Sequence, residues 1–150
     1  RAERPDAASS KRIARARKLF SAGKPVLGTL GATYLQGRGI TRLGPALRYH
    51  PRVFLWQGED DPDPPQRVPA LLAKITENRG QITGCARFYL DPSTGGLAEV
   101  ESPKRILGQL HGHAIRFWSG TPRSDLIVGE GLENTLSVGT ALPECINEIA

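Results

Sequence analysis

A single glutamate between two glycines is the residue whose type and setting best suit chemistry. Glu130 is flanked by Gly129 and Gly131, so its carboxylate has little steric cover. Such a group can take a Mg²⁺ ion or relay a proton. The local pattern slightly favours a simple flexible turn with an exposed glutamate, and one carboxylate alone makes a poor Mg²⁺ site.

Basic side chains form a second group of candidates. Arg87 lies two positions before Tyr89, and Lys104 is adjacent to Arg105. Arginine and lysine can hold phosphates, and a tyrosine ring can stack on a base. Each basic residue taken singly is better explained as a solvated side chain on an ordinary surface, so this pattern needs support from its context.

A basic amphipathic helix is predicted for Lys11–Phe20. Its apolar stripe consists of Ile13, Ala16 and Phe20, with Leu19 beside it. The cations around that stripe are Lys11, Arg12, Arg15 and Lys18. Ser9 or Ser10 could cap its start.

Charge is spread unevenly along the chain. Residues 1–56 contain twelve Lys and Arg against two acids, whereas residues 57–150 contain eight against thirteen. A basic first half suggests a polyanionic partner, most often nucleic acid. A solvated basic helix that binds nothing in particular explains the charge equally well.

The middle of the chain predicts a short helix and a small antiparallel sheet. The helix is expected over Thr29–Gly37, and Leu47–Leu55 is partly extended but interrupted by Pro51. Gly58–Pro65 is an acidic, proline-rich stretch that we expect to be an exposed connector. Pro69–Thr76 and Gln81–Leu90 form a hairpin around residues 77–80. In its second strand, alternation directs Ile82, Gly84, Ala86, Phe88 and Leu90 to the core, and Arg87 and Tyr89 to a surface or groove.

A strand–turn–helix unit is predicted near the end of the chain. Leu126–Val128 is a compact apolar run typical of a buried strand, and Leu132–Val138 is the helix. Glu130 therefore lies at the carboxyl end of a strand, where open α/β sheets bind ligands. An unpaired edge beside this strand would favour association with another chain or partial disorder.

Several classes of protein are excluded or disfavoured. No apolar run is long enough to span a bilayer, and no signal peptide is visible. Cys85 and Cys145 make neither a disulfide framework nor a zinc pattern, which favours a reducing, cytoplasmic setting. His111 and His113 lack partners at metal spacing. The sequence starts with Arg1 and contains no methionine, which predicts a processed product, a trimmed chain or a fragment.

The segment LIVGEGLENTLSV (126–138) resembles the first motif of the Toprim domain, which bacterial-type DNA primases, topoisomerases and some nucleases share. Four earlier phrases resemble plasmid- and phage-type Toprim primases, including primase-helicases. They are TYLQGRGI (33–40), LRYHP (47–51), ITGCARFYLDP (82–92) and SPKRILG (102–108). The resemblance covers roughly residues 14–138.

The resemblance implies roles for individual residues. Glu130 corresponds to the Toprim glutamate, which acts as general acid/base or helps to bind Mg²⁺, and Gly131 corresponds to the glycine of the turn. Arg87 and Lys104 correspond to basic residues that hold template and nucleotide phosphates, and Arg105 is adjacent. Toprim domains also need a later Asp-x-Asp motif for Mg²⁺. None follows Glu130, and Asp61-Pro-Asp63 precedes it.

We therefore expect an α+β chain in three parts. Residues 1–26 are a basic helix and tail, 27–121 a primase-like subdomain with a small antiparallel sheet, and 122–150 the incomplete start of an α/β Toprim domain. The parent protein would synthesise RNA primers during plasmid or phage replication, while these 150 residues alone would bind nucleic acid without synthesis. Its expected partners are single-stranded DNA, nucleoside triphosphates, Mg²⁺ and a replicative helicase, and no membrane. The alternatives are a non-catalytic nucleic-acid-binding module and another Toprim enzyme such as a nuclease.

Overall fold

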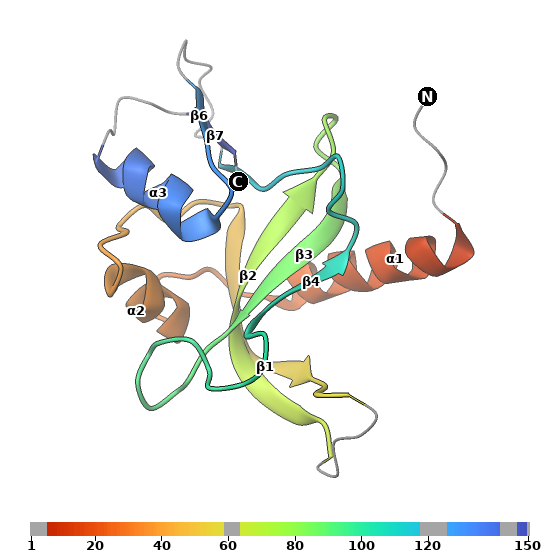
Figure 1. Ribbon diagram of the computed structural model, residues 1–150, viewed down its shortest axis with the longest axis horizontal. Coiled ribbons are helices and arrows are strands. Elements are labelled where there is room, and N and C mark those ends of the chain that lie inside the picture. The colour runs from red at the N-terminus through yellow and green to blue at the C-terminus, as the bar shows by residue number, and fades with distance from the viewer. Residues whose placement is uncertain (1–5, 59–63, 118–125, 142–146, 150) are drawn as a thin grey trace.

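The computed structural model describes residues 6–58, 64–117, 126–141 and 147–149 and has an α+β fold (Figure 1). Its helices are α1 (Ala7–Ala22), α2 (Leu30–Gln36) and α3 (Leu132–Ala141). Its strands are β1 (Leu47–Leu55), β2 (Gln66–Thr76), β3 (Ile82–Tyr89), β4 (Lys104–Gly108), β5 (Arg116–Phe117), β6 (Leu126–Val128) and β7 (Asn147–Ile149). Within these ranges, no helix is long and apolar enough to cross a bilayer.

The main sheet has four antiparallel strands in the order β1-β2-β3-β4. The predicted hairpin is confirmed by β2 and β3, and its turn ends at Gly80, whose φ of 84° suits glycine. β1 is an edge strand, and its register with β2 is interrupted between His50 and Val53, around Pro51. Proline lacks the N–H that a regular ladder needs, which explains the interruption predicted there.

Helices cover both faces of this sheet (Figure 1). On one face α1 packs with Ala16 and Phe20 against Cys85 and Tyr89. On the other face, the buried residues of α2 and α3 join Ala86 and Phe88 in a second core. The predicted core residues of β3 are therefore largely right, but the prediction that the opposite face lies on a surface or in a groove is wrong for Tyr89, which is 0 % exposed.

The first helix begins earlier than the sequence pattern predicts. Asp6 is its N-cap, and its carboxylate accepts a hydrogen bond of 2.6 Å from the backbone N–H of Ser9. Ser9 and Ser10 lie inside the helix, so the prediction that one of them caps it is wrong. The predicted apolar stripe is confirmed, because Ile13, Ala16 and Phe20 are buried.

A small second sheet has the strand order β5-β7-β6, with β6 parallel to β7. The strand and the helix predicted around Glu130 are both present, as β6 and α3. However, Leu126 and Val128 are 53 % and 68 % exposed, so the prediction that β6 is a buried strand is wrong. β6 is the last strand in this order, and the described residues leave these two side chains uncovered. The Asp61–Asp63 motif and Cys145 lie outside the described residues.

Candidate nucleic-acid interface

A cavity of about 530 Å³ lies where the N-terminus of α3 meets β3 and β4. The predicted site residues that line it are Arg87, Lys104, Arg105, Glu130 and Gly131. They come from three separate segments of the chain. Apolar side chains complete the lining, among them Phe88, Ile106 and Leu132. The cavity thus combines one exposed carboxylate, several cations and an apolar wall.

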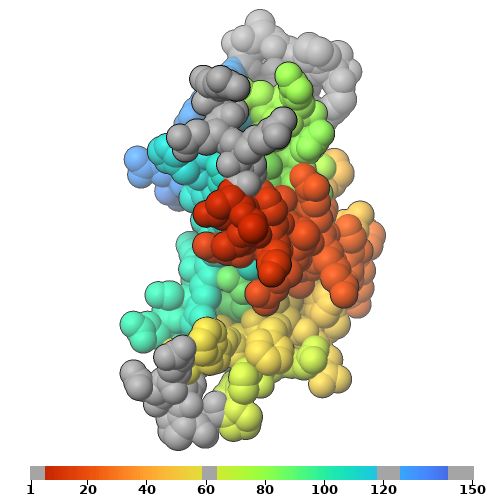
Figure 2. All heavy atoms as spheres, turned by 90° about the vertical axis from the view of Figure 1, so that its right-hand side faces the viewer, coloured from red at the N-terminus to blue at the C-terminus, as the bar shows by residue number. Residues whose placement is uncertain are grey.

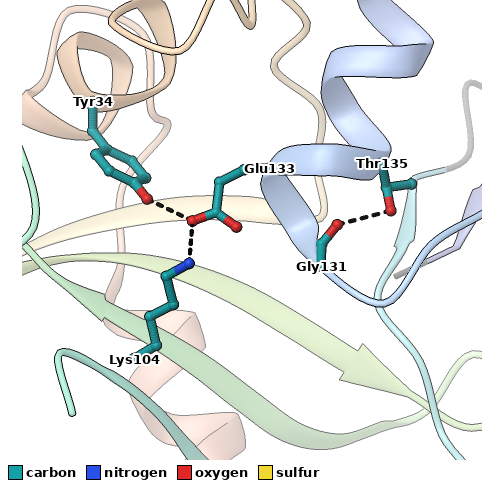
Figure 3. Close-up of polar contacts among 5 residues, drawn as sticks. All are labelled: Tyr34, Lys104, Gly131, Glu133 and Thr135. Carbon is teal, nitrogen blue, oxygen red and sulfur yellow. Dashed lines mark hydrogen bonds and ion pairs between the residues drawn. The ribbon is translucent and has the colours of Figure 1, made fainter.

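The turn that carries Glu130 depends on one of its two glycines. A Cβ atom at Gly129 would collide with the hydroxyl of Thr135. That hydroxyl donates a 2.8 Å hydrogen bond to the carbonyl of Gly131 and so closes the first turn of α3 (Figure 3). A Cβ atom at Gly131 would meet nothing within 4 Å, and its φ is not positive. Gly129, rather than Gly131, is the glycine that this turn requires.

The sequence analysis did not identify Glu133 of α3, whose carboxylate connects this helix to α2 and β4 (Figure 3). Its Oε1 accepts a 2.6 Å hydrogen bond from the Tyr34 hydroxyl of α2. The same oxygen lies 2.6 Å from the Lys104 Nζ of β4. Glu133 is buried, so these two contacts compensate a charge that has lost most of its water. The sequence feature that could have identified Glu133 is its position in the first turn of a helix, close to the buried residues Leu132 and Leu136.

Proton affinities follow from this arrangement. Burial acts to raise the pKa of Glu133, but the hydrogen bonds from Lys104 and Tyr34 outweigh it and lower that pKa below its usual value. Burial and the hydrogen bond to Glu133 raise the pKa of the Tyr34 phenol well above its usual range. Glu133 is therefore a carboxylate, and Tyr34 a neutral donor, at neutral pH.

Arg105 and Tyr89 have structural partners. The guanidinium of Arg105 donates to the carbonyls of Ser102, Trp56 and Glu101. The hydroxyl of Tyr89 donates a 2.7 Å hydrogen bond to the carbonyl of Phe54. Because the Tyr89 ring is fully buried, it has no face on which a base could stack, and the predicted stacking role does not fit this geometry.

Arg87 is half-buried and only partly satisfied. One of its terminal nitrogens donates to the Tyr89 hydroxyl at 3.2 Å, while its Nε is buried without a partner among the described residues. Arg87 lines two cavities, the one beside Glu130 and a second one beside α1. Of the predicted basic residues of α1, Arg15 and Lys18 line that second cavity, whereas Lys11 and Arg12 line neither.

Cys85 and His113 have structural surroundings. Cys85 is a buried free thiol, and burial raises its pKa to about 12, which suits a core residue and not a nucleophile. His113 forms a 2.7 Å contact between its Nδ1 and the Thr83 hydroxyl. Its ring is thereby engaged within the fold.

The residues of the cavity do not by themselves form a divalent-metal site. Across the described ranges, no three His, Cys, Asp or Glu side chains are grouped so that they could hold a metal ion. Glu130 is exposed, and Glu133 already binds Tyr34 and Lys104. A Mg²⁺ ion at this position would need further oxygen ligands, so we assign it no catalytic step.

Comparison with known proteins identifies the family of the sheet domain. Residues 10–117 match the family described as a domain of unknown function, DUF7146, and the chain belongs to this family. No curated protein and no solved structure matches the chain. The matched range begins inside α1, at Ser10, and ends at Phe117, the last residue of β5. It therefore contains most of α1 and the whole four-stranded sheet, and it ends before Glu130.

Proposed function

We propose that this member of the DUF7146 family is the template- and nucleotide-binding part of a cytoplasmic Toprim-type DNA primase. The observation that carries the proposal is the shared cavity, in which Lys104 of β4 and Glu130 of the strand–turn–helix unit are brought together. The sequence likeness to Toprim primases concerns the same two positions. Lys104 and Glu130 are far apart along the chain, so their presence in one cavity supports a common function independently of the sequence likeness.

The proposed reaction is transfer of a nucleotide to a growing primer. Glu130 accepts the proton of the attacking 3′-hydroxyl, the hydroxyl oxygen forms a bond to the α-phosphorus, and pyrophosphate leaves. Glu130 suits this role because it is exposed in the turn between β6 and α3 and forms no hydrogen bond or ion pair with another described side chain.

Lys104 is the proposed phosphate contact. Its side chain is 46 % exposed, and its ammonium has three N–H donors of which Glu133 takes one. The remaining donors can therefore reach a phosphate without breaking the bond to Glu133. The apolar wall formed by residues such as Ile106 and Leu110, both exposed, suits a base or ribose.

Template-directed synthesis tests the proposal. The full encoded protein is given single-stranded DNA, labelled ribonucleoside triphosphates and Mg²⁺, and primer formation is measured for Glu130→Gln and Glu99→Gln. Glu99 is exposed and does not line the cavity, so its variant removes the same charge elsewhere. We expect a loss of at least about 100-fold for Glu130→Gln only, in line with removal of a general base. Full activity of Glu130→Gln would remove the assigned role.

A non-catalytic nucleic-acid-binding module is the second candidate function. It is favoured by the cations Arg15 and Lys18, which line a second cavity that does not include the turn of Glu130. This function predicts salt-sensitive binding of oligonucleotides without any need for divalent ions and no primer synthesis by the full encoded protein. The synthesis experiment therefore separates the two candidates.

A further inference from the structure

The second cavity, of about 400 Å³, lies on the α1 side of the main sheet. Figure 2 shows the molecule from the side at which α1 begins, with the start of α1 (red) toward the viewer and the yellow segment that includes the end of β1 below it. The cations that line the cavity come from four elements and are Arg15 and Lys18 of α1, Arg52 of β1, Arg67 of β2 and Arg87 of β3. No aspartate or glutamate is among the described residues that line it. We call these cations, with His50 and Phe54, the α1-side groove.

The positive charge of the α1-side groove is not compensated within the described residues. The side chains of Arg15, Lys18 and Arg52 make no hydrogen bond or ion pair with another described residue. The Nε of Arg87 is buried and has no hydrogen-bond partner among the described residues. Several unpaired cations around one hollow repel one another, and an anion with several charges would relieve that repulsion.

His50 adds a further donor. Its Nδ1 accepts a 3.1 Å hydrogen bond from the backbone N–H of Arg52. In the neutral ring, acceptance at Nδ1 leaves Nε2 as the protonated nitrogen. His50 lines the groove and thus supplies Nε2–H as a further hydrogen-bond donor among its residues.

An aromatic face completes the α1-side groove. Phe54 is 51 % exposed, and its ring lies 5.6 Å from the guanidinium carbon of Arg67. The backbone carbonyl of Phe54 accepts a hydrogen bond from the hydroxyl of the buried Tyr89. This hydrogen bond holds the end of β1 in place. Cations that follow a backbone, together with an exposed ring on which a base can stack, characterise sites for single-stranded nucleic acids.

We propose that the α1-side groove binds a single-stranded nucleic acid, with its phosphates on Arg15, Lys18 and Arg52 and a base on Phe54. This site is distinct from the cavity of Glu130, and it rests on the proposed function only for the class of ligand. Arg87 lines both cavities, so the two sites are neighbours on β3. A strand held in the groove would be anchored without taking part in the reaction.

Two double variants of the same helix test this proposal. Arg15→Gln with Lys18→Gln removes two cations of the groove, and Lys11→Gln with Arg12→Gln removes one lysine and one arginine that line neither cavity. All four side chains are exposed, so both variants should keep the fold, which circular dichroism checks. Binding of a labelled single-stranded oligonucleotide to the 150-residue chain is measured by fluorescence anisotropy at salt concentrations between about 50 and 200 mM.

The groove variant is expected to bind roughly tenfold more weakly, and the slope of log affinity against log salt should fall by about 1.4, since each phosphate contact on a single strand contributes about 0.7. The Lys11/Arg12 variant should bind like the unsubstituted chain. Phe54→Leu should weaken binding roughly fivefold or more through loss of stacking. Equal losses for the two double variants would overturn the proposal, because they would indicate a general attraction to the helix.

Competition distinguishes a nucleic-acid strand from free phosphate. Inorganic tripolyphosphate is added at the phosphate concentration of the oligonucleotide. If it displaces the oligonucleotide equally well and Phe54→Leu has no effect, the groove is a site for free phosphate, and the strand proposal is wrong. If the chain binds as predicted but the full encoded protein makes no primers, the primase function fails while the groove proposal stands.

Discussion

The hydroxyl of Tyr34 in α2 donates a 2.6 Å hydrogen bond to the carboxylate of Glu133 in α3, ninety-nine positions later in the chain. Lys104 of β4 completes the arrangement at 2.6 Å from the same oxygen (Figure 3). These contacts fix the start of α3 against the main sheet and thereby define one wall of the cavity beside Glu130. The geometry of the proposed site therefore depends on a carboxylate that has no role in the proposed reaction.

Tyr34→Phe should lower the free energy of unfolding by about 1–2 kcal/mol, because it removes one of the two side-chain donors to the buried carboxylate of Glu133. Urea-induced unfolding measures this change. Tyr49→Phe is the control, since Tyr49 is also buried but its hydroxyl has no hydrogen-bond partner among the described residues. Similar losses for both variants would show that the Tyr34 hydroxyl contributes nothing specific.

Acid should weaken the fold through Glu133. Its pKa is lower in the folded chain than its usual 4.5, so its contribution to stability is present above about pH 4.5 and is lost as pH falls through the folded pKa. The free energy of unfolding should therefore fall more steeply below about pH 4.5 for the unsubstituted chain than for Glu133→Gln. Asp91, whose hydrogen bonds to Ser93 lower its pKa, affects both chains equally. Parallel pH profiles for the two chains would contradict the prediction.

The sequence predicts those features of the fold and the site whose interacting residues are close together along the chain. The α1 stripe and the β2–β3 hairpin were predictable, because Ile13, Ala16 and Phe20 follow helical spacing and Gly80 lies in a tight turn. The burial of Tyr89 was not, because strand alternation shows only that two faces differ and not that α1 covers the second. The role of Glu133 requires Tyr34 and Lys104, which no local pattern connects to it.

The packing of β6 explains the remaining difference. Leu126–Val128 has the composition of a buried strand, yet Leu126 and Val128, which lie on the same face of β6, are exposed because no described element covers that face. An apolar run of three residues gives no information about its neighbours in space. Composition predicted that a strand forms there, and only the topology could say which of its sides are covered.

Gly129→Ala should destabilise the turn by about 1–3 kcal/mol, because the added methyl group collides with the hydroxyl of Thr135. Gly131→Ala, which meets open space, should change the free energy of unfolding by less than about 0.5 kcal/mol. Thr135→Ala should relieve the collision in the double variant with Gly129→Ala. Urea-induced unfolding of the four chains gives the comparison, and an equal cost at both glycines would refute the assignment.

Arg48 should stabilise the end of α1. Its guanidinium lies within 3.4 Å of the carbonyl oxygens of Phe20, Ser21 and Gly23 at the end of α1. The last carbonyls of a helix lack the usual partners within the helix, and the Phe20 carbonyl also accepts the backbone N–H of Gly23. Arg48→Met should therefore lower the free energy of unfolding by about 1–2 kcal/mol. Arg52→Met, on the same strand, removes an exposed cation with no described side-chain partner and should leave stability almost unchanged while it weakens oligonucleotide binding.

Variants of the neighbouring residues Lys104 and Arg105 distinguish a structural role from a substrate-binding role. Its guanidinium donates to three backbone carbonyls, so Arg105→Gln should lower the free energy of unfolding by about 1–3 kcal/mol. Lys104→Gln removes the ion pair of Glu133 and leaves the Tyr34 hydroxyl as its one side-chain donor among the described residues (Figure 3). This variant should both destabilise the chain and impair primer synthesis by the full encoded protein. At a temperature where both variants are folded, Arg105→Gln should retain synthesis. A loss of synthesis equal to that of Lys104→Gln would instead place the Arg105 side chain on the substrate.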